Sequence, residues 1–174
     1  MSIAQAAGLP GLHQLFDTVA LSCIVGSGDA HLKNFGVLYR HPQLVDGTLA
    51  CQDCHLAPVY DVVNTTAYFP QEALALELRQ SKSLFAARLG LLEFAQTCNV
   101  ANPKDRIENI LQCVEQVLVT HADLAETVTQ VTKAIQASAE AFATTFGHPA
   151  PAQARKPHEE ALAPSGAGGG LSRT

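Results

Sequence analysis

The chain has 174 residues, 47% hydrophobic and 16% charged, which is enough apolar material for one folded domain of ordinary size. Its formal net charge of -5 argues against nucleic acid as a direct partner, and its apolar runs are too short to span a membrane. The N-terminus carries no export signal, so we expect a cytoplasmic protein whose five cysteines are reduced.

The first expected element is a helix. Apolar residues from Leu12 to Ile24 recur at 3.6 residues per turn and share one face. Gly26-Ser27-Gly28 follows directly and should end this helix.

A β-hairpin is expected next. Alternating apolar residues predict a strand from Phe35 to Tyr39, and the stretch from Leu49 to Tyr60 supplies a return strand. Two turn signals lie between them, His41-Pro42 and Asp46-Gly47.

The remainder is predicted to be helical. Ser83 is expected to cap a helix that runs to about Cys98, and Asn102-Pro103 supplies the N-cap and first residue of the next. Asp123 and Glu126 form a capping box for one last helix. The apolar stripe of that helix consists of Leu124, Val128, Val131, Ile135, Phe142 and Phe146.

Composition changes after Phe146. Residues 147–174 hold four of the nine prolines and five of the twelve glycines, so they cannot bury enough apolar surface to order themselves. We therefore expect a disordered tail at 147–174. Residues 1–146 should form one mainly α-helical domain with one small β-hairpin.

The densest polar stretch is Gly28-Asp29-Ala30-His31-Leu32-Lys33-Asn34, where the first helix gives way to the strand. An Asp followed five residues later by an Asn is the spacing of the catalytic loop in protein kinases, which also needs a second carboxylate. Asp61 supplies one at the end of the return strand, and a hairpin would bring it back beside Asn34. Amide and carboxylate oxygens suit Mg²⁺, so these two residues are candidate metal ligands.

Together, the motifs GDAHLKNF and LAPVYDVVNT resemble the HipA family of serine/threonine kinases, the toxins of bacterial toxin-antitoxin pairs, which have a protein-kinase-like fold. The resemblance covers roughly residues 12–146, with the densest agreement at 25–34 and 56–66. It implies a mainly helical C-terminal kinase lobe, ATP as the phosphoryl donor, a protein hydroxyl as the acceptor, and an antitoxin with a helix-turn-helix as a partner.

The same resemblance implies roles for individual residues. Asp29 corresponds to the catalytic Asp, and Asn34 and Asp61 to the Mg²⁺ ligands. His31 and Lys33 also match the family's catalytic loop.

One part of the kinase pattern is missing. Only 28 residues precede Asp29, and they contain neither a glycine-rich phosphate loop nor a strand lysine. The chain therefore resembles the C-terminal lobe alone, inactive unless an N-terminal lobe or companion subunit is supplied. The alternative is a non-catalytic remnant or binding module.

Cys51-Gln52-Asp53-Cys54-His55 fits C-x-x-C-H, the attachment pattern of a c-type haem. Haem attachment generally needs export, so we expect no haem. A zinc ion could use the two cysteines and His55, but the chain has no second C-x-x-C to complete the site. We interpret this stretch as a hairpin insertion whose thiols are incidental.

Overall fold

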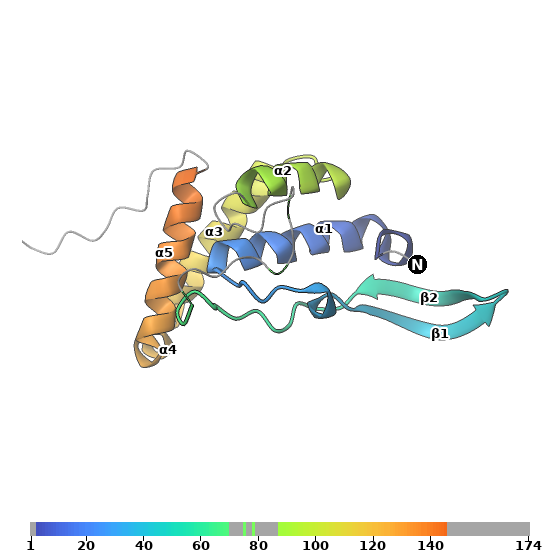
Figure 1. Cartoon of the computed structure of the whole chain (residues 1–174), viewed down its shortest axis with the longest axis horizontal. Coiled ribbons are helices and arrows are strands. Elements are labelled where there is room, and N and C mark those ends of the chain that lie inside the picture. The colour runs from blue at the N-terminus through green and yellow to red at the C-terminus, as the bar shows by residue number, and fades with distance from the viewer. Residues whose placement is uncertain (1–2, 70–74, 76–77, 79–86, 146–174) are drawn as a thin grey trace, which may run out of the picture.

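The computed structural model describes residues 3–69, 75, 78 and 87–145 (Figure 1). In this part of the chain, five α-helices and one two-stranded antiparallel sheet are present, which confirms the predicted mainly helical fold with one hairpin. The helices are α1 (Ile3–Val25), α2 (Ala87–Thr97), α3 (Pro103–Thr120), α4 (Ala122–Thr127) and α5 (Thr129–Thr145), and the strands are β1 (Val37–Val45) and β2 (Thr48–Leu56).

Helix α1 is the centre of the domain. It contacts α2, α3, α5 and the base of the hairpin, whereas the tip of the hairpin extends away from the helices (Figure 1). Its buried face follows the predicted apolar period, because side chains three or four residues apart lie on one side of a helix. The buried core contains Phe16, Val19, Ala20, Cys23 and Ile24 from α1, Leu91 and Ala95 from α2, Ile107 and Leu111 from α3, and Ala139, Phe142 and Ala143 from α5.

The end of α1 is set by Gly26, as predicted. Gly26 has a φ of 72°, a left-handed conformation that glycine adopts without steric cost. The Ser27 amide then donates to the carbonyl oxygen of Ser22 at 2.8 Å, which closes the last turn of the helix. This turn directs the chain into the polar stretch that begins at Gly28.

The hairpin turns at Asp46-Gly47, one of the two predicted turns. The other prediction is wrong, because His41-Pro42 lies inside β1 at an irregularity of the strand pairing. The return strand also ends at Leu56 rather than at Tyr60, since Leu56 is the last residue of β2. Residues 57–61 continue as an irregular segment.

The expectation that all cysteines are reduced is wrong for one pair. Cys51 and Cys54 form a disulfide within β2, while Cys23, Cys98 and Cys113 are free. A disulfide between residues only three apart needs a local bend in the strand, which the sequence pattern did not predict.

The predicted single helix after Asp123 is wrong. Its residues form two helices that are separated at Val128, and Asp123 lies inside α4 rather than at its N-cap. The hydroxyl of Thr127 donates to the Asp123 carbonyl at 3.1 Å and that of Thr129 to the Glu126 carbonyl at 2.6 Å. Threonine hydroxyls near a helix end compete with the helical hydrogen bonds in this way.

The start of α3 at Pro103 is confirmed, although the Asn102 side chain makes no capping hydrogen bond. The predicted cap Ser83, the end of the stripe at Phe146 and the tail at 147–174 lie outside the described residues. Within the residues that the structure describes, no helix has the length and hydropathy that crossing a membrane requires.

Candidate functional site

The two sequence motifs lie side by side. We name residues 26–36 the loop segment and residues 57–67 the return segment. At the base of the hairpin, the Ala57 amide donates to the carbonyl oxygen of Gly36 at 2.8 Å. The hairpin therefore brings Ala57 back beside Gly36, so the return segment begins next to the end of the loop segment.

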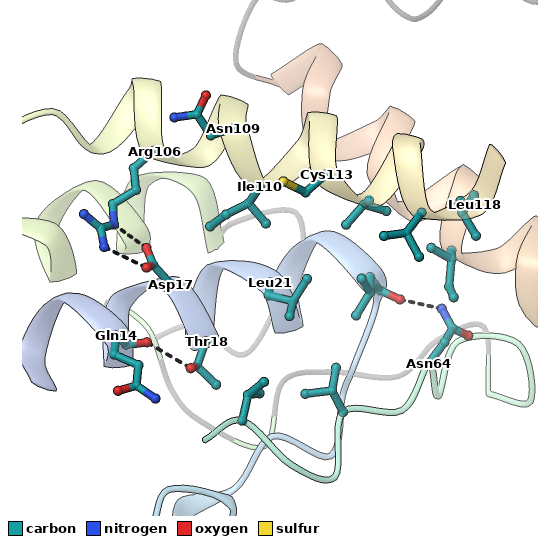
Figure 2. A pocket seen from close by; sticks show the side chains of 16 residues that line it. Gln14, Asp17, Thr18, Leu21, Asn64, Arg106, Asn109, Ile110, Cys113 and Leu118 are labelled. Carbon is teal, nitrogen blue, oxygen red and sulfur yellow. Dashed lines mark hydrogen bonds and ion pairs between the residues drawn. The ribbon is translucent and has the colours of Figure 1, made fainter. Parts of the chain in front are cut away.

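At the other end, Asn64 and Thr65 join the return segment to the end of α1 and to the start of the loop segment. The Asn64 side chain donates to the Val25 carbonyl at 2.6 Å (Figure 2). The Thr65 hydroxyl accepts from the Gly28 amide at 2.8 Å, and the Thr65 amide donates to the Gly26 carbonyl at 3.1 Å. The turn that precedes Asp29 is thereby attached to the return segment.

Asn34 and Asp61 meet between these two anchors. The Nδ2 atom of Asn34 donates to Oδ2 of Asp61 at 3.0 Å, and a second contact reaches the Asp61 carbonyl at 3.4 Å. Tyr60 braces the same region, because its hydroxyl donates to the Lys33 carbonyl at 2.6 Å. Residues 27 apart in the sequence thus place an amide and a carboxylate in direct contact.

Asp61 has a φ of 55°, a left-handed conformation that is rare for a residue other than glycine. Such a conformation persists only where neighbouring structure holds it, and such positions are concentrated at functional sites. The hydrogen bond from Asn34 and the anchors at Asn64 and Thr65 provide that support. The Asp61 side chain is nevertheless exposed, so its carboxylate is open to a ligand.

Three buried polar atoms of the loop segment lack a hydrogen-bond partner in the part of the chain that the structure describes. They are Oγ of Ser27, Nδ1 of His31 and Oδ1 of Asn34. Asn34 is only 7% exposed, and a buried acceptor without a partner is costly unless a ligand or water satisfies it. The Asn34 oxygen beside Asp61 is therefore suited to a bound cation.

The remaining predicted site residues lie on the same segment. Asp29 is exposed in the turn after α1, Lys33 is exposed in a short 3-10 helix, and His31 is half-buried between them. Within the described residues, no hydrogen bond or ion pair joins Asp29 to Asn34 or Asp61. The structure therefore brings together the two candidate metal ligands and places Asp29 on the same short loop.

The sequence interpretation assigned no role to Tyr60, Asn64 or Thr65. Their polar side chains stand in an otherwise apolar stretch directly around Asp61, which is the feature that could have identified them. In the structure they act as positioning residues, since each bonds the backbone of the loop segment or of the end of α1.

A cavity of about 740 Å³ is lined by residues of α1, α3 and the return segment, together with Ile135 of α5 (Figure 2). Its walls are mostly aliphatic, and Asp17 and Arg106 form an ion pair at its edge, with Nη2 and Oδ2 2.8 Å apart. The hydrogen bond from Arg106 to Asp17 raises the pKa of Arg106. The lining residues include Asn64 but none of the predicted site residues, so this cavity is a separate feature.

Among the described residues, no group of three or more His, Cys, Asp or Glu side chains is arranged to hold a metal ion. The zinc alternative at Cys51, Cys54 and His55 therefore has no ligand set there, and the two cysteines are joined to each other. The pair of Asn34 and Asp61 is a different kind of site, because Mg²⁺ at phosphate-transfer sites takes one or two protein oxygens and completes its shell with phosphates and water.

Comparison with known proteins gives two matches. The model of the HipA-like C-terminal domain family matches residues 2–143. A protein of Sinorhizobium fredii named "Putative kinase Y4mE" is 31% identical over 120 residues, which are 64% of this chain and 26% of that protein. The chain thus corresponds to about a quarter of the length of this relative. No solved structure gives a significant match.

Proposed function

The chain belongs to the HipA-like C-terminal domain family, and from this premise we propose that it is the catalytic lobe of a serine/threonine protein kinase. In this proposal the lobe transfers the γ-phosphoryl group of ATP to a hydroxyl of a protein substrate. The name of the relative, a kinase, agrees with a kinase-related function.

The contact between Asn34 and Asp61 carries the proposal. In it the amide nitrogen of the buried Asn34, whose oxygen has no partner, donates to the exposed carboxylate of Asp61, a residue in the left-handed conformation. Asn34 also follows Asp29 by five residues, the spacing of the kinase catalytic loop. This donor set fits Mg²⁺, a hard cation that prefers oxygen ligands. When bound, Mg²⁺ would neutralise negative charge on the phosphate oxygens of ATP.

The other loop residues have complementary roles in this proposal. The exposed Asp29 carboxylate orients the substrate hydroxyl and accepts its proton. The exposed Lys33 ammonium offsets the charge that develops on the transferred phosphoryl group. The half-buried His31 positions the loop between them, with its Nδ1 atom available for one hydrogen bond.

Phosphoryl transfer also needs a second lobe, because the nucleotide must be covered and its γ-phosphate held in line with the hydroxyl. The only sheet in the described part of the chain is the β1–β2 hairpin, which is no nucleotide-covering lobe. We propose that the site works with an N-terminal lobe, on the same polypeptide or on a companion subunit, and that the 174-residue chain alone transfers little phosphate.

The family resemblance also supports a toxin-antitoxin role with a helix-turn-helix antitoxin as partner. Co-expression of the chain with the protein encoded next to it, followed by size-exclusion chromatography, tests this part separately. Separate elution of the two proteins would contradict it and leave the catalytic proposal standing.

Transfer from radiolabelled ATP tests the catalytic proposal. We expect little transfer by the chain alone and restored transfer after a compatible N-terminal lobe is added. Asp29→Asn and Asp61→Asn should each lower the restored rate by ~10²-fold or more. Asp46→Asn is the matched control, because Asp46 is also exposed with a positive φ, at 50°, but lies at the tip of the hairpin.

Mg²⁺ binding by titration calorimetry provides a second readout. Asn34→Ala and Asp61→Asn should both weaken it, whereas Asp46→Asn should not. Unchanged transfer in Asp61→Asn would refute the assigned site. If the unmodified chain binds no Mg²⁺ and transfers no phosphate with any added N-terminal lobe, the non-catalytic alternative is favoured.

A further inference from the structure

The Cys51–Cys54 disulfide lies in a part of the hairpin where the strand pairing is offset. Pairs at the base and at the tip follow one common register, whereas Arg40 and Gln52 in the middle are displaced from it by one residue. The observed pairs are Val37 with Leu56, Leu38 with His55, Arg40 with Gln52, Gln43 with Ala50, Leu44 with Leu49, and Val45 with Thr48.

Two bulges of opposite sense produce this offset. Between the pairs of Leu38 and Arg40, β2 carries one extra residue, and between the pairs of Arg40 and Gln43, β1 carries one. Each bulge contains a residue in the left-handed conformation, Asp53 with φ 50° and His41 with φ 48°. Residues other than glycine adopt this conformation at a cost, so the offset needs a compensating interaction.

The disulfide supplies that interaction. Three residues of a regular strand separate two Cα atoms by about 10 Å. A disulfide requires a separation below about 7 Å. The Cα atoms of Cys51 and Cys54 are 6.6 Å apart, so β2 is contracted between them. The bulge at Asp53 accounts for the contraction, so the disulfide depends on the bulge.

A regular hairpin is available to the same sequence once the disulfide is broken. Continuing the common register through the middle would pair Arg40 with Asp53 and Pro42 with Cys51, with no extra residue on either strand. Counting from the Asp46-Gly47 turn, Pro42 then falls at a position without cross-strand hydrogen bonds, where its missing N–H costs nothing. Neither bulge remains in this arrangement.

We propose that Cys51 and Cys54 form a thiol-disulfide exchange site, at which reduction by a protein dithiol shifts the hairpin from the bulged to the regular register. One thiolate of the dithiol attacks a sulfur of the pair and forms a mixed disulfide, and the other cysteine leaves as a thiolate. The second thiol of the reductant then resolves the mixed disulfide. Two electrons and two protons pass to Cys51 and Cys54, and the reductant becomes a disulfide.

The position of the pair permits this reaction. Both cysteines are half-buried rather than enclosed, on a hairpin whose tip extends away from the helices (Figure 1). Both registers share the same turn and the same base, where Leu56 is only 3% exposed. The shift is therefore confined to the middle of the hairpin, and the contact between Asn34 and Asp61 is retained.

Thiol counting tests the exchange. Before reduction, the folded protein should react with one maleimide, at the exposed Cys113, because Cys23 and Cys98 are buried. After treatment with a small protein dithiol such as a thioredoxin, it should react with three. Three labels before reduction, or one label after it, would refute the proposed exchange site.

Nuclear magnetic resonance tests the register. A close contact between the Hα atoms of Arg40 and Asp53 should appear on reduction and be absent from the oxidised protein, because these atoms approach only in the regular register. The double variant Cys51→Ser with Cys54→Ser should show this contact without a reductant. Persistence of the Arg40–Gln52 pairing in the reduced protein would overturn the register shift.

Glycine substitution tests the coupling between bulge and disulfide. Asp53→Gly removes the cost of the left-handed residue, so it should raise the equilibrium ratio of disulfide to dithiol by about fivefold or more. Asn99→Gly is the matched control, since Asn99 has a φ of 54° in the connection between α2 and α3. An equal change in both variants would contradict the coupling.

Discussion

Asn64 donates its side-chain amide to the carbonyl oxygen of Val25 at 2.6 Å, and this bond joins the end of α1 to the segment that carries Asp61. Its Oδ1 atom accepts from the Ala67 amide at 2.8 Å, so one buried side chain satisfies backbone groups on both sides. The relative position of the loop segment and the return segment thus depends on Asn64, which is not one of the predicted metal ligands.

Replacing Asn64 by Ala should lower the free energy of unfolding by about 2–3 kcal/mol, because the Val25 carbonyl and the Ala67 amide lose their partner. Urea denaturation measures the loss. Asn102→Ala is the control, since the Asn102 side chain is exposed and makes no capping bond, and it should change stability by less than about 0.5 kcal/mol. Equal effects of the two variants would contradict the anchoring role.

Tyr60→Phe removes the hydroxyl that donates to the Lys33 carbonyl and leaves the ring in place. We expect a loss of about 1 kcal/mol or less, since Tyr60 is exposed, but faster hydrogen exchange at Asn34 and Phe35. Tyr39→Phe, an exposed tyrosine of the hairpin, provides the matched control. If exchange at these amides is the same in both variants, Tyr60 does not brace the loop.

A comparison of the variants Gly26→Ala and Gly47→Ala separates the free-energy cost of a left-handed backbone from the cost of steric crowding. Both glycines have a positive φ, 72° and 74°. A Cβ at Gly26 would lie 2.9 Å from the Thr66 hydroxyl and 3.0 Å from Nδ2 of Asn64, whereas a Cβ at Gly47 would meet nothing within 4 Å. Each change should cost about 1 kcal/mol for the conformation, and Gly26→Ala should cost about 1–3 kcal/mol more. Thermal denaturation of the pair measures the difference.

Cys23 should make stability depend on alkaline pH. Burial raises the pKa of its thiol from 9.0 to about 12, so between these values the unfolded chain loses a proton that the folded chain retains. The stabilising contribution is complete below pH 9 and is lost as the pH rises toward 12, at up to about 1.4 kcal/mol per pH unit. Urea denaturation from pH 8 to 10.5 should show this decline.

A Cys23→Ala variant is the control for this pH dependence, because it removes the titrating group and should make the decline shallower. The thiol of Cys98, whose pKa burial raises to about 11, contributes a similar decline in both proteins. Identical slopes for the variant and the unmodified protein would show that Cys23 does not titrate on unfolding.

Local features were predictable wherever one residue type enforces one backbone geometry. The end of α1 at Gly26, the hairpin turn at Asp46-Gly47 and the start of α3 at Pro103 follow from glycine's tolerance of positive φ and from proline's fixed φ. The apolar period of α1 likewise identified the face that is buried. Predictions from side-chain capping alone failed, since Asn102 makes no cap and Asp123 lies inside α4.

For the candidate site, the sequence by itself determined the residue types and their spacing, namely Asp29, Asn34 and a later carboxylate at Asp61. The predicted hairpin also implied that Asp61 returns beside Asn34. Only the tertiary structure decided that the two side chains form a direct hydrogen bond and that Asn64 anchors the returning segment. It also decided the pairing of Cys51 with Cys54, which depends on a bulge between two strands. Contacts of this kind arise from packing between distant segments, and no local periodicity encodes them.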